Sequence, residues 1–165
     1  MSDTDRPAEP KSEPADHPGV ILPPPVVYAC GLIAGVLIDM VLPLPLVSAP
    51  ARWIVAAVFI AAGLVLAVGA TTLFRRAGTH VQPHKPSTTV VTGGVYRYSR
   101  NPIYVGLTAL YLGLASVANT WWAAILLVPV LAVIHWGVIA REERYLEGKF
   151  GETYRAYRAR VRRWI

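Results

Sequence analysis

The sequence has little charge and almost no cysteine. Of its 165 residues, 16% are charged and one is a cysteine, Cys30, so an intramolecular disulfide is excluded. Hydrophobic residues make up 54% of the chain, which is more than a soluble domain of this length places in one core. The composition therefore argues against an ordinary soluble domain and indicates a membrane protein.

The first 25 residues lack the apolar content that a folded core needs. Residues 1–25 are rich in aspartate, glutamate, serine and proline, with few apolar side chains before Val20. We therefore expect a disordered tail. Because the segment begins acidic rather than basic and has no early apolar core, it does not resemble a secretory signal.

Long apolar runs follow the tail. A bilayer-spanning helix takes about 20 mostly apolar residues. The run 103–140 is long enough for two spans, and Asn119-Thr120 followed by two tryptophans predicts a turn at the bilayer surface. We therefore expect an all-α integral membrane protein with about four transmembrane helices. The expected helices span 26–47, 53–74, 103–118 and 121–140, within a membrane domain of residues 26–165.

The net charge of +6 is distributed unevenly along the chain. Basic residues gather in the loop 75–102 and after Ala140, whereas Arg52 is expected on the other side. The positive-inside tendency then predicts that both termini and this loop lie in the cytoplasm, at an inner or plasma membrane. Because the basic residues lie next to apolar spans, we expect them to face a lipid bilayer, and we expect no nucleic-acid partner.

The end of the chain alternates arginines with apolar and aromatic residues. Over 155–165 the sequence is RAYRARVRRWI. This pattern is typical of a helix that lies on an anionic lipid surface. We therefore expect a C-terminal amphipathic surface helix over about 141–162.

Two features of the first apolar run have a structural and a functional interpretation. Asp39 is the one acidic residue within an apolar run, and an ionisable group in a membrane is often functional. Its position about a turn before Pro43 instead favours a solvated helix end. The Gly31-x-x-x-Gly35 pattern favours close helix packing.

The loop 75–102 is longer than a connection between two helices needs. It contains threonine, valine and aromatic residues, so we expect it to be ordered and functional. Gly93-Gly94 allows a tight turn or the close approach of a ligand. Pro102 restricts Asn101 to extended geometry and favours a helix start at this point.

Three motifs follow one another in the second half of the chain. They are TGGVYRYSRNPIYVG at 92–106, Glu142-Glu143 with Leu146, and FGETYRAY at 150–157. In this order they resemble the isoprenylcysteine carboxyl methyltransferase and phospholipid methyltransferase superfamily. The resemblance implies an enzyme that transfers a methyl group from S-adenosyl-L-methionine to a lipophilic or small acceptor at the cytoplasmic membrane face. The acceptor group, whether carboxylate, amine or thiol, and the oligomeric state stay open.

The resemblance also implies which residues form the site. They come from the loop, the start of the following helix and the segment after the last span, and no metal is expected. The implied cofactor-binding residues are Gln82, Thr88, Thr89, Val90, Val91, Tyr96, Asn101, Pro102, Ile103, Tyr104 and Glu142. The implied catalytic residues are Arg100, Asn101, Tyr104, Glu142 and Glu143.

The chemistry of these side chains suits methyl transfer. Transfer from a sulfonium is an in-line displacement, so the protein mainly has to hold donor and acceptor close together. Tyr96, Tyr98 and Tyr104 offer ring faces to a sulfonium. Arg100 can hold a carboxylate, and the two glutamates can accept from amino or hydroxyl groups. The alternative is that these arginines anchor the chain at the bilayer surface and the tyrosines belong to an interfacial belt.

Asn101 stands where the family motif has a histidine. Asparagine forms hydrogen bonds but is no general base near neutral pH. His135 lies seven residues before Glu142, on roughly the same face of an expected helix, and is a candidate for that base. The alternative is a structural histidine, which within a membrane should have a partner.

Two other functions stay open from sequence alone. Some sterol and steroid reductases have a similar C-terminal region, so a membrane reductase that uses NADPH is one alternative. A non-catalytic membrane scaffold is another. The scaffold would explain the helices but not the three ordered motifs.

Overall fold

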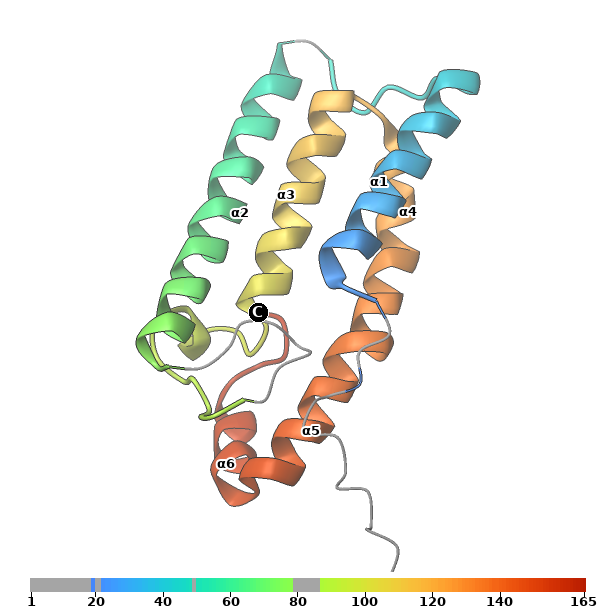
Figure 1. Ribbon diagram of the computed structural model, residues 1–165. Coiled ribbons are helices and arrows are strands. Elements are labelled where there is room, and N and C mark those ends of the chain that lie inside the picture. The colour runs from blue at the N-terminus through green and yellow to red at the C-terminus, as the bar shows by residue number, and fades with distance from the viewer. Residues whose placement is uncertain (1–18, 20–21, 49, 79–86) are drawn as a thin grey trace, which may run out of the picture.

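The computed structural model describes residues 19, 22–48, 50–78 and 87–165, and all regular secondary structure within them is helical (Figure 1). The prediction of an all-α chain is therefore confirmed. Most of the tail expected over 1–25 lies outside the described residues. The helices are α1 (Pro24–Val41), α2 (Ala51–Arg76), η1 (Gly94–Arg97), α3 (Pro102–Ala118), α4 (Trp121–Ala132), η2 (Val133–Ile139), α5 (Ala140–Phe150) and α6 (Glu152–Arg160).

Local sequence explains where the helices begin and end. α1 and α3 each carry a proline in the first turn, where its missing N–H costs nothing. α1 ends at Val41 rather than near residue 47, because Pro43 and Pro45 cannot continue the helix. α4 continues directly into η2, a π-helical segment, and then into α5.

Local capping contacts close one end of the bundle, which we call the turn end. Asn119 adopts the left-handed conformation with φ of 55°, and the Thr120 hydroxyl accepts a hydrogen bond from the Trp122 N–H at 3.1 Å. The turn predicted at Asn119-Thr120 is thus confirmed. Asp39 Oδ1 accepts from the Leu44 N–H at 2.9 Å, which confirms that this carboxylate serves the end of α1.

Figure 1 shows α3 between α2 on one side and the pair α1 and α4 on the other. Small residues allow this close approach. A Cβ added to Gly63 would lie 2.8 Å from the Gly106 carbonyl oxygen, and one added to Gly35 would lie 2.6 Å from the backbone of Ala123. The close helix packing predicted at Gly35 is therefore confirmed.

The helices have the length and surface of membrane spans. α1, α2 and the continuous helix from Trp121 to Phe150 are each long and apolar enough to cross a bilayer, and α3 is a shorter apolar helix. Large apolar side chains on their outer faces are exposed, among them Ile33, Leu37, Val65 and Val128. Such faces suit a hydrocarbon surrounding, so the structure supports an integral membrane protein.

The C-terminal region differs from the single surface helix expected over 141–162. Gly151, with φ of 50°, separates α5 from α6. Tyr154 and Tyr157 on α6 are buried against the protein, so they are not available to lie on a bilayer. Beyond α6 the chain folds back to the start of α3, where the Arg100 N–H donates to the Arg162 carbonyl at 2.9 Å (Figure 1).

Candidate active site

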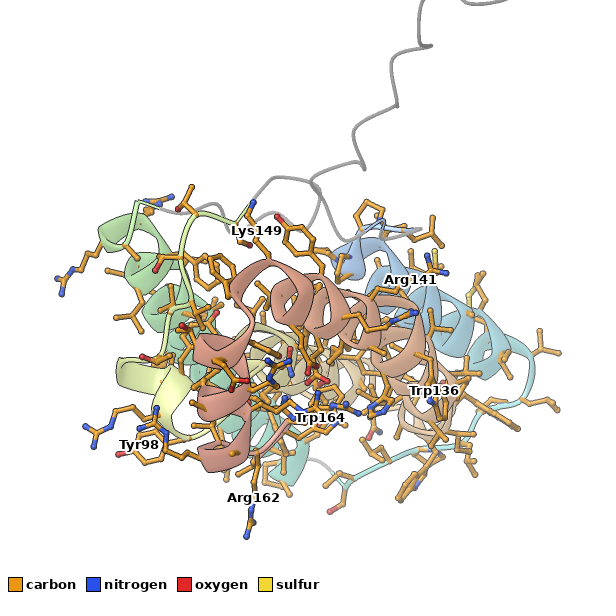
Figure 2. All side chains as sticks on the ribbon, turned by 90° about the horizontal axis from the view of Figure 1, so that it is seen from below. Tyr98, Trp136, Arg141, Lys149, Arg162 and Trp164 are labelled. Atoms are coloured by element: carbon orange, nitrogen blue, oxygen red, sulfur yellow. The ribbon has the colours of Figure 1, made fainter. Side chains whose placement is uncertain are left out.

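Polar side chains gather at the opposite end of the bundle from the turns. We call this region the polar end and define it as η1, residues 98–101, the first turn of α3, α5, α6 and residues 161–165. Figure 2 looks onto this end, with Trp164 near the middle of the view and Tyr98, Arg162 and Lys149 at the edges. All three motifs of the sequence analysis meet here.

Tyr104 and Glu142 form the central pair. The Tyr104 hydroxyl donates to Glu142 Oε1 at 2.8 Å, across 38 residues of sequence. Tyr104 is buried in the first turn of α3, next to the helix-starting Pro102. The Tyr28 hydroxyl of α1 donates to the Tyr104 carbonyl at 3.3 Å. The structure thus brings together one predicted residue from the first motif and one from the second.

Tyr96 lies next to this pair, whereas Tyr98 does not. Tyr96 is buried, its ring lies 5.4 Å from that of Phe74, and its carbonyl accepts from the Tyr157 hydroxyl at 2.8 Å. Burial raises the pKa of the Tyr96 hydroxyl well above its ordinary value, with smaller contributions from Tyr157 and Glu142, so Tyr96 is a neutral phenol. Tyr98 is 76% exposed and points outward in Figure 2, so its ring lies apart from the buried Tyr104–Glu142 pair.

Glu143 points into a separate ionic cluster. It is 6% exposed and lies between two arginines. Arg100 Nη1 is 3.0 Å from Glu143 Oε1, while Arg163 Nε donates to Oε1 at 3.0 Å and Arg163 Nη2 to Oε2 at 2.5 Å. The bidentate hydrogen bonding between Arg163 and Glu143 is stronger than a single hydrogen bond between an arginine and a carboxylate. Arg100 and Glu143 therefore hold each other and the chain end.

Asn101 also holds the chain end. Its Nδ2 donates to the Arg163 carbonyl at 2.9 Å, and its N–H donates to Ser99 Oγ at 3.0 Å. The residue is nearly buried. Asn101 thus acts as a hydrogen-bond donor, a role that a histidine ring N–H also fills and that needs no proton transfer.

His135 has the partner that a polar group within a membrane needs. Its Nε2 lies 2.9 Å from Arg163 Nη1, and because a guanidinium only donates, Nε2 is the acceptor. Its ring stacks on Trp164 with 6.3 Å between centroids and 19° between planes. His135 lies in η2, whose wide π turns depart from the 3.6-residue spacing that predicted a shared face with Glu142. The two residues have different partners.

The remaining predicted cofactor residues lie along the loop and the start of α3. The Ser87 N–H donates to the Tyr145 hydroxyl at 3.2 Å, which places this part of the loop beside α5. Gln82 lies outside the described residues, and the described part of the chain holds no cluster of three or more possible metal ligands. Thr88 and Thr89 are exposed, Val90, Val91 and Ile103 are half-buried, and Pro102 is fully buried.

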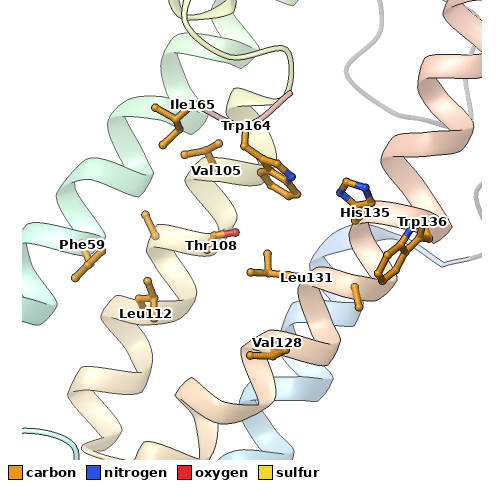
Figure 3. A pocket seen from close by; sticks show the side chains of 12 residues that line it. Phe59, Val105, Thr108, Leu112, Val128, Leu131, His135, Trp136, Trp164 and Ile165 are labelled. Carbon is orange, nitrogen blue, oxygen red and sulfur yellow. The ribbon is translucent and has the colours of Figure 1, made fainter. Parts of the chain in front are cut away.

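An apolar cavity between α3 and α4 was not predicted from sequence. Its volume is about 650 Å³, and its lining is apolar apart from Thr108 and His135 (Figure 3). Small residues at Ala109 and Ala132 leave room between the helices. In the sequence, the only sign of this cavity is that small and larger apolar residues, such as Ala109 between Val105 and Leu112, follow one another at helical spacing. That pattern is also common in ordinary helix packing.

Comparison with known proteins decides the family. The model of the phospholipid methyltransferase family matches residues 51–153, which is more than half of the chain. The chain belongs to this family. The predicted relationship is therefore confirmed, and it supports a membrane methyltransferase.

Two curated relatives are similar over parts of the chain. An uncharacterized protein of Haemophilus influenzae is 38% identical over 65 residues, which is 34% of this chain and all of that protein. The protein-S-isoprenylcysteine O-methyltransferase of Schizosaccharomyces pombe is 36% identical over 72 residues, which is 44% of this chain and 30% of that protein. The chain thus matches less than a third of the fission-yeast enzyme. No solved structure matches.

Proposed function

We propose that this chain binds S-adenosyl-L-methionine at the polar end and transfers its methyl group to a lipophilic or small acceptor with a carboxylate, amine or thiol nucleophile. The observation that carries the proposal is the 2.8 Å hydrogen bond between Tyr104 and Glu142. It joins two motifs that are far apart in sequence, beside the buried ring of Tyr96.

The residues around this pair suit such a cofactor. A carboxylate has about four acceptor positions, so Glu142 can bind the Tyr104 hydroxyl and also an amino group or ribose hydroxyls. Tyr96 offers a neutral aromatic face that favours a sulfonium. The loop from Thr88 to Val91 and the half-buried Ile103 complete the proposed binding surface. The bound sulfonium would supply the methyl group.

The chain's own contribution is to hold and orient the reactants. Burial of Tyr104 fixes the phenol that orients Glu142, and the Tyr28 hydroxyl holds the Tyr104 backbone carbonyl. The Arg100–Glu143–Arg163 cluster keeps α3, α5 and residues 161–165 together. We therefore assign Arg100, Asn101 and Glu143 to positioning, and Tyr104 and Glu142 to contact with the cofactor.

Two features support a membrane acceptor approached from the cytoplasmic side. The apolar cavity adjoins the polar end, so a hydrocarbon chain could lie in it while its polar group reaches the site. Arginines cluster at this same end, on the last turn of α2 and along α5 and α6. By the positive-inside tendency the polar end faces the cytoplasm.

Calorimetric titration of the purified protein with S-adenosylhomocysteine, and in parallel with NADPH, tests the proposal. We expect binding of S-adenosylhomocysteine that weakens about 30-fold in Glu142→Gln, because an amide offers a single, weaker acceptor oxygen than a carboxylate. Glu147→Gln is the matched control on the same helix, since Glu147 pairs with Arg155 and Arg158 outside the site. Binding of NADPH alone would favour a reductase instead.

A further inference from the structure

Trp164 lies where the apolar cavity meets the polar end. Figure 3 shows its indole between Val105 and Thr108 of α3 and His135 of η2, with Ile165 beside it. Leu112 and Val128 lie at the other end of the same cavity. The indole therefore lines the end of the cavity near the start of α3, where Tyr104 directly precedes Val105.

The position of Trp164 is fixed by contacts from three helices. Its ring stacks on His135 of η2. The preceding residue, Arg163, binds Glu143 of α5 through its guanidinium and Asn101 at the start of α3 through its carbonyl. Arg163 also donates to His135 at 2.9 Å. One residue therefore holds both the backbone next to the indole and the His135 ring on which the indole stacks.

The cavity suits a hydrocarbon chain rather than a polar ligand. Both polar side chains of its lining are already engaged within the protein. The Thr108 hydroxyl donates to the Tyr104 carbonyl at 2.8 Å and lies 2.8 Å from the Tyr28 hydroxyl, and His135 Nε2 accepts from Arg163. The volume of about 650 Å³ lies in the range of sites for small molecules. Located between two apolar helices, the cavity is open to an occupant that comes from the bilayer.

We propose that Trp164 is a specificity-determining residue for the acceptor and that Arg163 is the positioning residue that fixes it. This inference rests on the proposed function. A hydrocarbon chain of the acceptor lies in the cavity, and the indole ends the cavity below the methyl-transfer site. The indole thereby sets how far a chain reaches along η2 and which part of the acceptor meets Glu142.

Photo-cross-linking with a generic lipid probe tests this role. The protein is reconstituted in phosphatidylcholine nanodiscs with a palmitate probe that carries a diazirine at mid-chain, and cross-linked residues are mapped by mass spectrometry. In the wild type we expect labelling of Leu112, Val128 and Leu131. In Trp164→Ala we expect labelling of His135 to rise about tenfold relative to Val128, because the chain can then advance into the space of the indole.

Matched variants separate a specific role from general damage. Trp164→Phe keeps an aromatic ring on His135 and should restore the wild-type pattern. Trp121→Ala, at the far end of α4, should also leave it unchanged. Arg163→Gln should shift the labelling in the same direction as Trp164→Ala. It loses the bidentate hydrogen bonds to Glu143 that fix the position of the indole. Two results would overturn the inference. One is wild-type labelling that spreads over outer faces such as Ile33 and Val65, and the other is a Trp164→Ala protein that keeps the wild-type labelling pattern.

Titration of the same nanodiscs with S-adenosylhomocysteine distinguishes this inference from the function on which it rests. We expect Trp164→Ala to bind S-adenosylhomocysteine within about twofold of the wild type. An unchanged cross-linking pattern with intact S-adenosylhomocysteine binding rejects the role of Trp164 alone. A wild-type protein that binds no S-adenosylhomocysteine rejects the proposed function, while a shifted pattern would still establish Trp164 as the end of a lipid cavity.

Discussion

The two ends of the helix bundle are built in different ways. At the turn end, Asp39, Asn119 and Thr120 cap helices and turns through short contacts that suit short connections. At the polar end, Glu143 is buried between Arg100 and Arg163, which are distant in sequence. Burying ion pairs costs desolvation energy and stabilises a fold only weakly. Their presence at one end alone, among the described residues, therefore points to a functional demand at that end.

Breaking the buried cluster should have the largest effect. We expect Glu143→Gln to lower the free energy of unfolding by about 3 kcal/mol, because it leaves the buried guanidinium of Arg100 without its counter-charge. Thermal unfolding in detergent measures this change. Glu152→Gln is the control, since the Glu152–Arg155 pair is exposed and its loss should not change the melting temperature. Equal melting temperatures for all three proteins would mean that the cluster does not hold the polar end together.

A packing change near the turn end should destabilise the fold without touching the site. In Gly35→Val the new Cβ would lie 2.6 Å from the Ala123 backbone, so we expect a loss of about 2 kcal/mol from overpacking. Gly148→Ala on α5 has open space around its Cβ and should be tolerated. The Gly35→Val protein that remains folded should keep its affinity for S-adenosylhomocysteine. A parallel loss of that affinity would show that the two ends are not independent.

Removing one hydroxyl at the polar end should weaken cofactor binding without destabilising the fold. Tyr104→Phe removes the hydroxyl that orients Glu142, and we expect about tenfold weaker binding of S-adenosylhomocysteine with little change in unfolding. Tyr98→Phe alters an exposed ring of the same 92–106 motif and should bind as the wild type does. Calorimetry of both variants checks this. Equal affinities would remove Tyr104 from the site.

The smallest effect is expected at Asp39. Asp39→Asn keeps an oxygen that can accept from the Leu44 N–H, so the free energy of unfolding should change by less than about 0.5 kcal/mol. S-adenosylhomocysteine affinity should not change. A large loss of either would mean that this carboxylate has a function within the membrane and that the turn end is more than a connection.

Sequence alone predicted the helices well because their signals are local. The helix expected over 103–118 is Pro102–Ala118, and the one expected over 53–74 is Ala51–Arg76. The first helix ends at Val41 rather than near residue 47, because Pro43 and Pro45 cannot continue a helix. An apolar run shows that a helix crosses the bilayer, but its prolines decide where it ends.

The site was only partly predictable from sequence. The family resemblance implied Tyr104 and Glu142 as site residues, and the structure places them in contact. It also implied Arg100 and Glu143, which the structure pairs with each other in a separate cluster. The roles of Arg163 and Trp164 depend on the chain folding back after α6. No periodicity reveals such a return, and the π turns of η2 change the spacing around His135 on which a helical prediction relies.

Ultraviolet cross-linking of labelled S-adenosylmethionine, followed by peptide mapping, tests most directly whether the polar end holds the methyl donor. We expect label in the peptides that carry Tyr96, Tyr104 or Glu142, and we expect this label to disappear when excess S-adenosylhomocysteine competes. Label at the turn end, or label that S-adenosylhomocysteine does not displace, would contradict it.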